Sequence, residues 1–358
     1  MKFLAVCNHI GGLNALMPVI NKVKISHEII VLTNILNKEK FTNIGIPIFF
    51  LDHKIKIKEA KKFMINNFID LLITSTSEPE DHNIGRLESI FVYSSKGLGI
   101  KSFVIIDSWQ KYRERFSLSS SNCLEAIPTK IFTIDSKSKS GMIKNGFPKE
   151  KIIVTGNPAW EKLSSMSEKL KFLKFEDIYS KLKIKKSYKY IFFISQPISE
   201  RQGYLKEYDE FKVLKEIIEV IKKLNNKSNE KFILFIKNHP SEKKDKYKKI
   251  VDQNKNIIFD WEIDGMNIYE LSKFAAVNIG MFSMLLKELE LIGHRVLSFQ
   301  PNLQNEQLIY TGINEEVVRS KTQLIKKIDN INTTRIKNKQ SMIFNSSTKI
   351  LKLIGEEF

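Results

Sequence analysis

Two side chains in the second half of the chain could together bind the phosphates of a nucleotide. His239 directly follows the apolar run Lys231–Lys237, and Ser283 follows the apolar run Ala276–Gly280. Short runs rich in Phe, Ile and Val are typical of strands that are buried on both faces. Ligands bind at the carboxyl ends of the strands in an open α/β sheet. An imidazole and a hydroxyl at such an edge therefore predict a site for phosphate oxygens.

The residues around Ser283 extend this predicted nucleotide site. Gly280 opens the loop that leads to Ser283, and Ser283 is placed to cap a helix over Met284–Ile292. The free N–H groups at a helix start attract phosphate. Glu288 lies about one turn into this helix, where its carboxylate could accept hydrogen bonds from both hydroxyls of a ribose.

Each of these features also has a purely structural explanation. The pair His239-Pro240 is common in ordinary loops, because proline stops a strand, and a serine before a helix is usually only its N-cap. Their order favours a functional interpretation: strand, His-Pro, helix, strand, Gly-x-x-Ser, helix with Glu288, strand. We therefore include Pro240 in the predicted nucleotide site.

Two further stretches of the second half are predicted to contact the nucleotide. The apolar run Lys189–Ser195 ends in Ser195 and Gln196, and the loop after it could bind a phosphate or leaving group, or be an exposed charged loop. Trp261 follows the predicted strand Ile257–Asp260. Its ring could contact the nucleotide base, although most tryptophans serve packing.

The elements that must position these residues are those of an α/β protein with parallel sheets. Short apolar runs alternate with helix-like segments along the whole chain, which is the pattern of doubly wound sheets. The other predicted strands are Lys2–Cys7, His27–Thr33, Ile46–Leu51, Asp70–Thr74, Ser102–Ile106, Lys130–Ile134, Lys151–Gly156 and Arg295–Phe299. With 358 residues, the chain is long enough for two such domains.

A change in composition separates the two predicted domains. Residues 166–188 are rich in Lys and Ser with weak helical periodicity, so we place the connection there. The predicted domains are then 1–165, which binds the acceptor, and 189–340, which binds the nucleotide. Residues 341–358 are expected to form a C-terminal helix.

The first domain carries a second set of polar residues after a predicted strand. Asp107 follows Ser102–Ile106, and Trp109, Tyr112 and Arg113 come shortly after it. A carboxylate at a strand end could act as general base for a sugar hydroxyl, with aromatic and cationic side chains binding the acceptor. The alternative is that Asp107 caps the next helix while Trp109 packs in the interior.

Charge and cysteine content exclude several classes of function. The net charge is +18, from 58 Lys and Arg against 40 Asp and Glu, and the lysines are dispersed among Ile and Asn. No aromatic-interleaved basic strand or zinc-ligand spacing accompanies them, so we expect neither nucleic-acid binding nor a metal site. Contact with an anionic membrane surface stays open.

The distant Cys7 and Cys123 indicate a reducing cytoplasm, and no apolar run reaches the length of a membrane helix.

The motifs of the second half resemble the carboxyl-terminal domain of GT-B glycosyltransferases. The similarity is to bacterial enzymes with a His-Pro motif, which transfer sialic acid or Kdo from CMP, or polymerise CDP-glycerol, in surface polysaccharide synthesis. It implies two Rossmann-like domains that face a cleft, with His239 and Ser283 on the nucleotide phosphates and Glu288 on the ribose. It also implies that the C-terminal helix crosses back to the first domain.

The resemblance extends to the first domain. The loop with His9, Gly11 and Gly12 would face the cleft and contact the acceptor, although a plain tight turn explains the glycines equally well. The string Asp107–Phe116 resembles D-H-W-x-N-Y-x-x-R-F of polysaccharide-biosynthesis transferases, but Ser and Lys replace its His and Asn. If that His is the family's base, this chain lacks it, which leaves Asp107 or Glu78 as base.

The sequence thus predicts a metal-independent GT-B glycosyltransferase in the cytoplasm or peripherally at the inner membrane. It would transfer a sugar, preferably a CMP-linked nonulosonic acid or Kdo, from a nucleotide donor to a glycan or lipid-linked acceptor, with no further cofactor. One alternative is a non-hydrolysing UDP-sugar 2-epimerase, which needs additional acidic and basic groups around the sugar, or a UDP-sugar or CDP-glycerol transferase. The other alternative is an inert scaffold that binds glycan or membrane.

Overall fold

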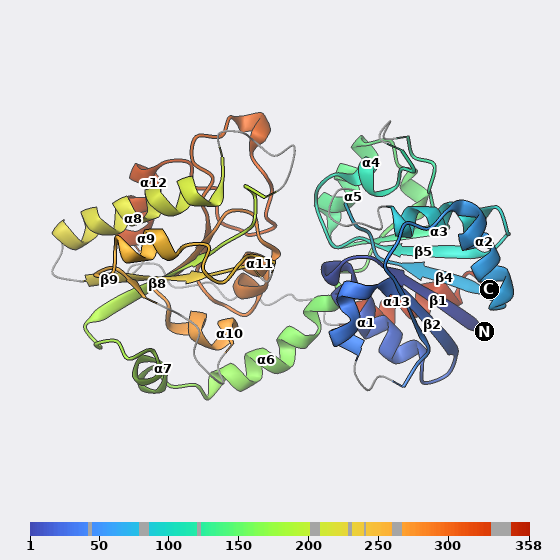
Figure 1. The fold of residues 1–358 in the computed structure, drawn as a ribbon, viewed down its shortest axis with the longest axis horizontal. Helices are drawn as coiled ribbons and strands as arrows, with labels where there is room; N and C mark the ends of the chain where they lie inside the picture. The colour runs from blue at the N-terminus through green and yellow to red at the C-terminus, as the bar shows by residue number, and fades with distance from the viewer. Residues whose placement is uncertain are drawn as a thin grey trace. The chain divides into compact units, whose positions relative to one another are not determined.

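The chain consists of two compact units, each built on its own parallel sheet. The structure, a computed structural model, describes residues 1–41, 45–78, 86–119, 123–200, 208–227, 231–239, 241–259, 267–330 and 345–358. Unit 1 comprises Met1–Lys162 and Ile343–Phe358, and unit 2 comprises Leu163–Met342. Figure 1 shows both units, with the helices and several of the strands labelled.

Unit 1 has a seven-stranded parallel sheet in the order β3-β2-β1-β4-β5-β6-β7. Its strands are β1 (Lys2–Cys7), β2 (Glu28–Asn34), β3 (Ile48–Leu51), β4 (Leu71–Thr74), β5 (Lys101–Ile105), β6 (Lys130–Thr133) and β7 (Ile152–Val154). Its α-helices are α1 (Ile10–Val23), α2 (Ile57–Asn66), α3 (Leu87–Lys96), α4 (Tyr112–Arg115), α5 (Ser136–Lys144) and α13 (Ser346–Gly355). Short 3₁₀ turns are η1 (Ile35–Phe41), η2 (Lys149–Lys151) and η3 (Pro158–Trp160).

Unit 2 has a five-stranded parallel sheet in the order β10-β9-β8-β11-β12. Its strands are β8 (Tyr188–Ile194), β9 (Lys231–Lys237), β10 (Ile258–Phe259), β11 (Val277–Gly280) and β12 (Val296–Ser298). Its α-helices are α6 (Lys162–Lys171), which begins at the unit boundary, α7 (Phe175–Leu182), α8 (Glu210–Lys227), α9 (Lys248–Asp252), α10 (Ile268–Leu271), α11 (Met284–Leu291) and α12 (Lys321–Asp329). The 3₁₀ turns are η4 (Ser272–Phe274) and η5 (Asn305–Gln307).

Helices cover both faces of each sheet, which explains why the strands are apolar runs rather than alternating ones. Along β1, Leu4 and Val6 belong to one hydrophobic core, whereas Phe3 and Ala5 belong to the core on the opposite face. The predicted fold class, an α/β protein of two doubly wound domains, is confirmed.

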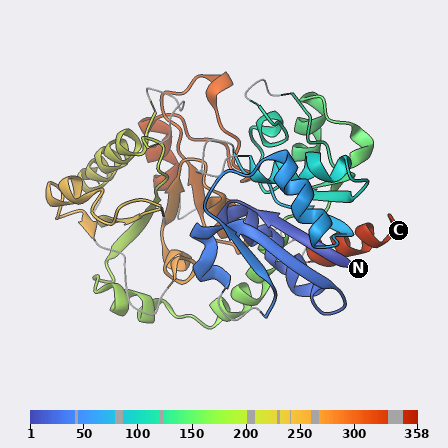
Figure 2. The same cartoon turned by 45° about the vertical axis from the view of Figure 1, so that its right-hand side comes forward.

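Helix α13 returns the end of the chain to unit 1 and packs against α1. Figure 1 and Figure 2 both show it, in red, beside the blue N-terminal elements. Ile350 and Ile354 are buried in the same core as Val19 of α1. The hydroxyl and the backbone N–H of Ser347 donate to Glu161 at 2.8 and 2.6 Å.

Two segments differ in detail from the expected pattern. Helix α1 begins at Ile10, so Gly11 and Gly12 lie inside its first turn instead of forming a separate turn. Residues 166–188 contain the rest of α6 and α7 rather than an irregular connection, and Ile178 and Tyr179 of α7 are buried in a core of unit 2. Helix α6 buries only Leu163 and Leu170, whereas α7 buries one face with Ile178, Tyr179 and Leu182. The expectation of weak helical periodicity was therefore wrong for α7.

Candidate functional site

The carboxyl edge of the unit 2 sheet brings together the residues predicted to bind a nucleotide. Strands β9, β8 and β11 are adjacent, and Lys237, Ile194 and Gly280 are paired in register at their ends. The loops that follow carry His239, Ser195 with Gln196, and Ser283. These polar groups therefore start from the same edge at the same level.

His239 is half-buried, and its ring is held in one orientation by the next turn. Its Nδ1 accepts the backbone N–H of Ser241 at 3.2 Å and lies 2.7 Å from Ser241 Oγ. Because Nδ1 accepts an N–H, the proton of the neutral ring resides on Nε2. The second ring nitrogen is thus a donor, as a phosphate oxygen requires. Pro240 lies outside the described residues.

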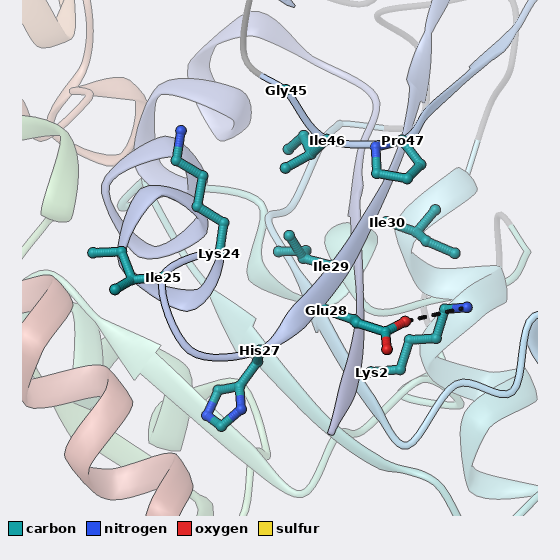
Figure 3. Close-up of a pocket in the computed structure, with 10 residues that line it drawn as sticks. All are labelled: Lys2, Lys24, Ile25, His27, Glu28, Ile29, Ile30, Gly45, Ile46 and Pro47. Atoms are coloured by element: carbon teal, nitrogen blue, oxygen red, sulfur yellow. Dashed lines mark ion pairs between the residues drawn. The ribbon is translucent and has the colours of Figure 1, made fainter.

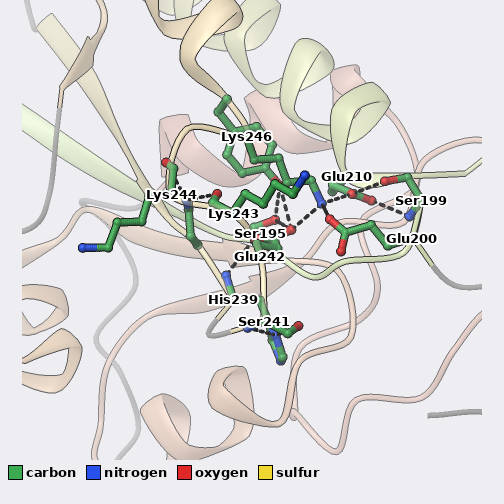
Figure 4. A network of polar contacts seen from close by, with 12 residues as sticks. Ser195, Ser199, Glu200, Glu210, His239, Ser241, Glu242, Lys243, Lys244 and Lys246 are labelled. Carbon is green, nitrogen blue, oxygen red and sulfur yellow. Dashed lines mark hydrogen bonds and ion pairs between the residues drawn. The ribbon is translucent and has the colours of Figure 1, made fainter. Parts of the chain in front are cut away.

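Ser195 reaches the same edge, but its hydroxyl is used inside the protein. It is buried, donates to Glu242 Oε1 at 2.9 Å and contacts Tyr247 OH. Glu242 also accepts the backbone N–H of His239 at 2.7 Å, as Figure 4 shows. Ser195 therefore supports the loop after β9 from within.

Gln196 and Ser283 shape the start of α11. Gln196 Oε1 accepts the backbone N–H of Phe282 at 2.8 Å, and Ser283 Oγ caps the helix by accepting the N–H of Leu285 at 3.3 Å. A Cβ on Gly280 would lie 3.2 to 3.3 Å from Leu286 and from the carbonyl of Ile194. Gly280 thus allows α11 to pack closely on β11 and β8.

Glu288 is half-buried on α11 and accepts a hydrogen bond from the hydroxyl of Tyr269. Burial, together with the charge of Glu288, raises the pKa of Tyr269 well above its ordinary value. Tyr269 thereby fixes the orientation of the carboxylate that the sequence assigned to a ribose. Trp261 lies outside the described residues.

The carboxyl edge of the unit 1 sheet carries the second set of predicted residues. Strands β1, β4, β5 and β6 are adjacent in that sheet. His9 caps α1, since its Nδ1 accepts the backbone N–H of Gly11 at 3.0 Å. A Cβ on Gly12 would lie 2.2 Å from Ser75 Oγ, so this glycine is required by the packing of α1 on the loop after β4.

Asp107 and Glu78, the two candidate bases, have different surroundings. Glu78 receives hydrogen bonds from Lys111 at 2.8 Å and Arg115 at 3.0 Å. Asp107 has a 16% exposed side chain and lies 3.8 Å from Arg115, and its buried Oδ1 accepts no hydrogen bond from the described residues. A Cβ on Gly11 would lie 3.1 Å from Asp107 Oδ2. Asp107 therefore sits at the start of α1 with bonding capacity to spare.

Three more of the residues predicted to bind the acceptor, those after Asp107, take part in contacts within unit 1. Trp109 donates from Nε1 to Asp135 at 2.9 Å, and Tyr112 is buried. Arg113 donates to the carbonyl of Asn145 at 2.7 Å. Tyr112 packs so closely on α5 that a Cβ on Gly141 would lie 2.8 Å from its ring.

Glu88 of α3 is a buried carboxylate that the sequence motifs did not identify. It is 3% exposed and accepts the backbone N–H of Asn8 at 2.8 Å and the hydroxyl of Ser77 at 2.7 Å. Burial raises the pKa of Glu88, although the hydrogen bonds from Asn8 and Ser77 oppose this shift. The available signal was a glutamate one turn before the apolar pair Phe91 and Val92 of the same helix.

A surface hollow of about 470 Å³ lies in unit 1. Lys2 and Glu28, the first residues of β1 and β2, line it together with Ile29 and Ile46, as Figure 3 shows. It therefore opens at the amino edge of the unit 1 sheet, opposite the edge with His9 and Asp107. Its lining is mainly apolar, and none of the predicted site residues contributes to it.

Within the described residues, no three His, Cys, Asp or Glu side chains are grouped so as to hold a metal ion. Over the same ranges, no helix has the length and apolar character needed to cross a membrane.

Comparison with known proteins identifies the fold. The sequence matches no protein-family model and no curated protein. UDP-GlcNAc 2-epimerase from Methanocaldococcus jannaschii superposes with a TM-score of 0.67 at 16% identity, over 99% of this chain and 100% of that chain. The enzyme of that name from Neisseria meningitidis, bound to UDP-GlcNAc, gives 0.66 at 16% identity with the same coverage. MurG from Acinetobacter baumannii gives 0.60 at 11% identity, again over 99% and 100%. The chain therefore has the two-domain GT-B fold.

Proposed function

We propose that the protein is an enzyme acting on a nucleotide sugar, with the phosphates bound at the carboxyl edge of the unit 2 sheet. The convergence of loops from three adjacent strands carries this proposal. These loops supply the Nε2–H of His239, the amide of Gln196 and the N-terminus of α11 at Ser283. Helix N-termini and N–H donors are the groups that bind phosphate. Glu288 would take the ribose hydroxyls.

The activity that we favour is 2-epimerisation of a UDP-linked amino sugar. The fold similarity to UDP-GlcNAc 2-epimerases extends over 99% of the chain, and one of those structures contains UDP-GlcNAc. This activity was an alternative on sequence grounds, and it now takes precedence over the CMP-sugar transfer that the motifs favoured.

For the epimerase, we assign the proton transfer to a carboxylate of unit 1. Proton removal from C2 requires loss of UDP from C1 in the same step, because no carbonyl next to C2 can take up the electron pair. The C–H pair then forms a C1–C2 double bond, and the return of a proton to the other face of C2 with re-addition of UDP at C1 completes the inversion. We assign Asp107 as the base, because it follows β5 at the carboxyl edge of the sheet and its side chain is 16% exposed. Glu78 is bound by Lys111 and Arg115, so we assign it to the placement of Arg115.

Glycosyl transfer is the second candidate. The His-Pro pair and the string from Asp107 to Phe116 favour it, since both resemble transferases. In that reaction Asp107 would deprotonate a hydroxyl of a glycan or lipid-linked acceptor. A peripheral membrane contact would then bring the enzyme to its acceptor.

Nucleotide binding is tested by the melting temperature of the protein with CMP, CDP, UDP and GDP. A ligand at 100 times its Kd stabilises the folded state by about 2.7 kcal/mol. Stabilisation by UDP supports the epimerase, and stabilisation by CMP or CDP supports the transferase. The variant His239→Ala should bind more weakly and show a smaller rise in melting temperature at the same nucleotide concentration. If none of the four nucleotides stabilises the wild-type protein, the proposal is wrong.

The reaction is tested by incubation with UDP-GlcNAc in D₂O without any acceptor. An epimerase that exchanges the C2 proton through a protein base gives the C2 epimer with deuterium at C2, which proton NMR detects. A transferase leaves the substrate unchanged under these conditions. Because the proposed chemistry uses side chains alone, dialysis against EDTA should leave the rate unchanged.

A further inference from the structure

We infer that Glu242 is a positioning residue for the nucleotide site, because it fixes the loop that carries His239. The inference rests on the proposed binding of phosphate by His239. It assigns a role to a carboxylate that does not itself need to touch the substrate.

The carboxylate of Glu242 joins two loops at the edge of the unit 2 sheet. Oε2 accepts the backbone N–H of His239 at 2.7 Å. Oε1 accepts from Ser195 Oγ at 2.9 Å, Tyr247 OH at 3.0 Å and Lys246 Nζ at 2.8 Å. The side chain has no exposed area. Figure 4 shows these contacts converging on one group.

The same contacts determine how His239 presents its ring. The backbone N–H of Glu242 donates to the carbonyl of His239 at 2.9 Å, so both backbone polar groups of His239 are used within the turn. The turn places the N–H of Ser241 on Nδ1 at 3.2 Å. The protonation of Nε2 therefore depends on a turn that Glu242 closes.

Lys246 supplies the positive charge that lets Glu242 stay buried. Its ammonium contacts Glu242 and Glu210, whose side chains are both fully buried, and the half-exposed Glu200. Burial alone would lower the pKa of Lys246, but its hydrogen bonds to Glu210 and Glu242 raise it above the usual value. Two buried carboxylates thus share one cation, and the network links the loop after β9 to α8.

A double-mutant cycle for UDP binding tests the role of Glu242. We expect Glu242→Gln to weaken UDP binding about tenfold in the wild-type background and less than about twofold in a His239→Ala background, because a positioning residue acts through the residue it positions. Titration calorimetry measures both. The matched control is Glu219→Gln, which should leave UDP affinity unchanged. Glu219 is a glutamate of α8 that pairs with Lys321. Equal losses in both backgrounds would overturn the inference.

Nitrogen-15 NMR of the histidine rings tests the same point without a nucleotide. Wild-type His239 should show the Nε2–H tautomer, and Glu242→Gln should shift it toward a mixture of tautomers. An unchanged signal would contradict the inference. If Glu242→Gln does not fold, Glu242→Asp retains the charge opposite Lys246 and withdraws the carboxylate by one methylene. Failure of the wild-type protein to bind UDP would count against the proposed function, whereas the NMR result decides the role of Glu242.

Discussion

His9 and His239 are held in the same way in the two units. Each Nδ1 accepts the backbone N–H of the residue two positions later, Gly11 or Ser241. Each ring therefore carries its proton on Nε2 and presents a donor. Both rings follow a strand at the carboxyl edge of a sheet, which is the edge where ligands bind in open α/β sheets.

The assignment of Asp107 as base leads to a prediction for Asp107→Asn. The amide cannot take up a proton, so we expect the rate of conversion of UDP-GlcNAc to fall by about 100-fold or more, which is the usual contribution of a general base. UDP affinity should be unchanged, because the proposed nucleotide site consists of unit 2 residues. Asp52→Asn is the control, since Asp52 is exposed and pairs with His53. A rate within twofold of wild type, roughly, would exclude Asp107 as base.

His294 predicts a dependence of stability on pH. It is buried, its Nδ1 lies 2.8 Å from Ser272 Oγ, and its Nε2 has no hydrogen-bond partner among the described residues. Burial, with a contribution from Lys273, lowers the pKa of His294 to about 3 from 6.5. Between these values the unfolded chain binds a proton that the folded protein does not. The free energy of unfolding should therefore decrease as pH falls below about 6.5, by roughly 1.4 kcal/mol per pH unit.

Urea unfolding between about pH 4.5 and 7.5 measures this dependence. His294→Asn keeps a polar group beside Ser272 and cannot titrate, so its stability should vary less with pH than that of the wild type. His27→Asn, at an exposed position, is the matched control and should retain the wild-type slope. Identical slopes for all three proteins would show that His294 titrates normally.

At the scale of elements, a buried glutamate stabilises the histidine loop in each unit. Glu88 accepts the N–H of Asn8, next to His9, in unit 1, and Glu242 accepts the N–H of His239 in unit 2. The two glutamates differ in how their buried charge is balanced. Glu242 pairs with the ammonium of Lys246, whereas burial raises the pKa of Glu88. Carboxylates thus organise the edge of both sheets.

The close packing at the start of α1 predicts that adding one methyl group at Gly12 will strongly reduce stability. In Gly12→Ala the new Cβ would meet Ser75 Oγ at 2.2 Å, and α1 must shift away from the loop after β4. We expect a loss of about 1–3 kcal/mol in the free energy of unfolding. Gly355→Ala in α13 is the matched control, since no atom lies within 4 Å of the new Cβ. Removing a helical glycine should stabilise the protein by about 0.5–1 kcal/mol. Chemical denaturation of Gly12→Ala and Gly355→Ala compares their free energies of unfolding.

The shared cation of unit 2 predicts a strong effect of Lys246→Met. The substitution leaves Glu210 and Glu242 buried without a counter-charge. The free energy of unfolding of unit 2 should therefore fall by about 3–5 kcal/mol. Lys321→Met removes a 39% exposed lysine from an ion pair with Glu219 and should cost at most about 1 kcal/mol. Thermal unfolding distinguishes the two variants.

The effect of Lys246→Met should depend on pH. Burial alone would raise the pKa of Glu210, but hydrogen bonds from Lys246 and Ser199 outweigh it and lower the pKa from 4.5. A lowered folded-state pKa contributes stability above pH 4.5 that is lost as the pH falls through the folded value. The difference in free energy of unfolding between the wild type and Lys246→Met should therefore become smaller below that pH. A constant difference would show that the lost interaction is not ionic.

At the scale of the whole molecule, the chain passes through unit 2 and ends on unit 1. Helix α13 completes the core that β1 and α1 begin, with Ile350 fully buried. Ser347 adds hydrogen bonds to Glu161. The first and last elements of the sequence therefore depend on each other for stability.

Substitution of Ile350 by alanine tests this dependence. Loss of a fully buried side chain should reduce the stability of unit 1 by about 2–5 kcal/mol and leave unit 2 unchanged. Scanning calorimetry should show a shift of one transition only. Lys352→Ala, on the exposed side of the same helix, is the control and should change stability by less than about 0.5 kcal/mol. Equal shifts in both transitions would mean that α13 does not belong to unit 1 alone.

The sequence by itself determined the alternation of strands and helices, because the strands are covered on both faces and read as apolar runs. The runs Lys2–Cys7 and Lys231–Lys237 were predicted with the bounds that β1 and β9 have. It also indicated which polar residues follow strands, such as His239 and Asp107. Parallel strands place such residues at one edge.

Only the tertiary structure decided which of these side chains are bonded to distant parts of the protein. Ser195 and Glu78 looked as suitable as His239 and Asp107, but Ser195 is bonded to Glu242 and Glu78 is bound by Arg115. Those partners come from other elements, 47 and 37 residues away along the chain. A local pattern carries no information about such distant contacts, because they depend on strand order and on the packing of loops at the sheet edge.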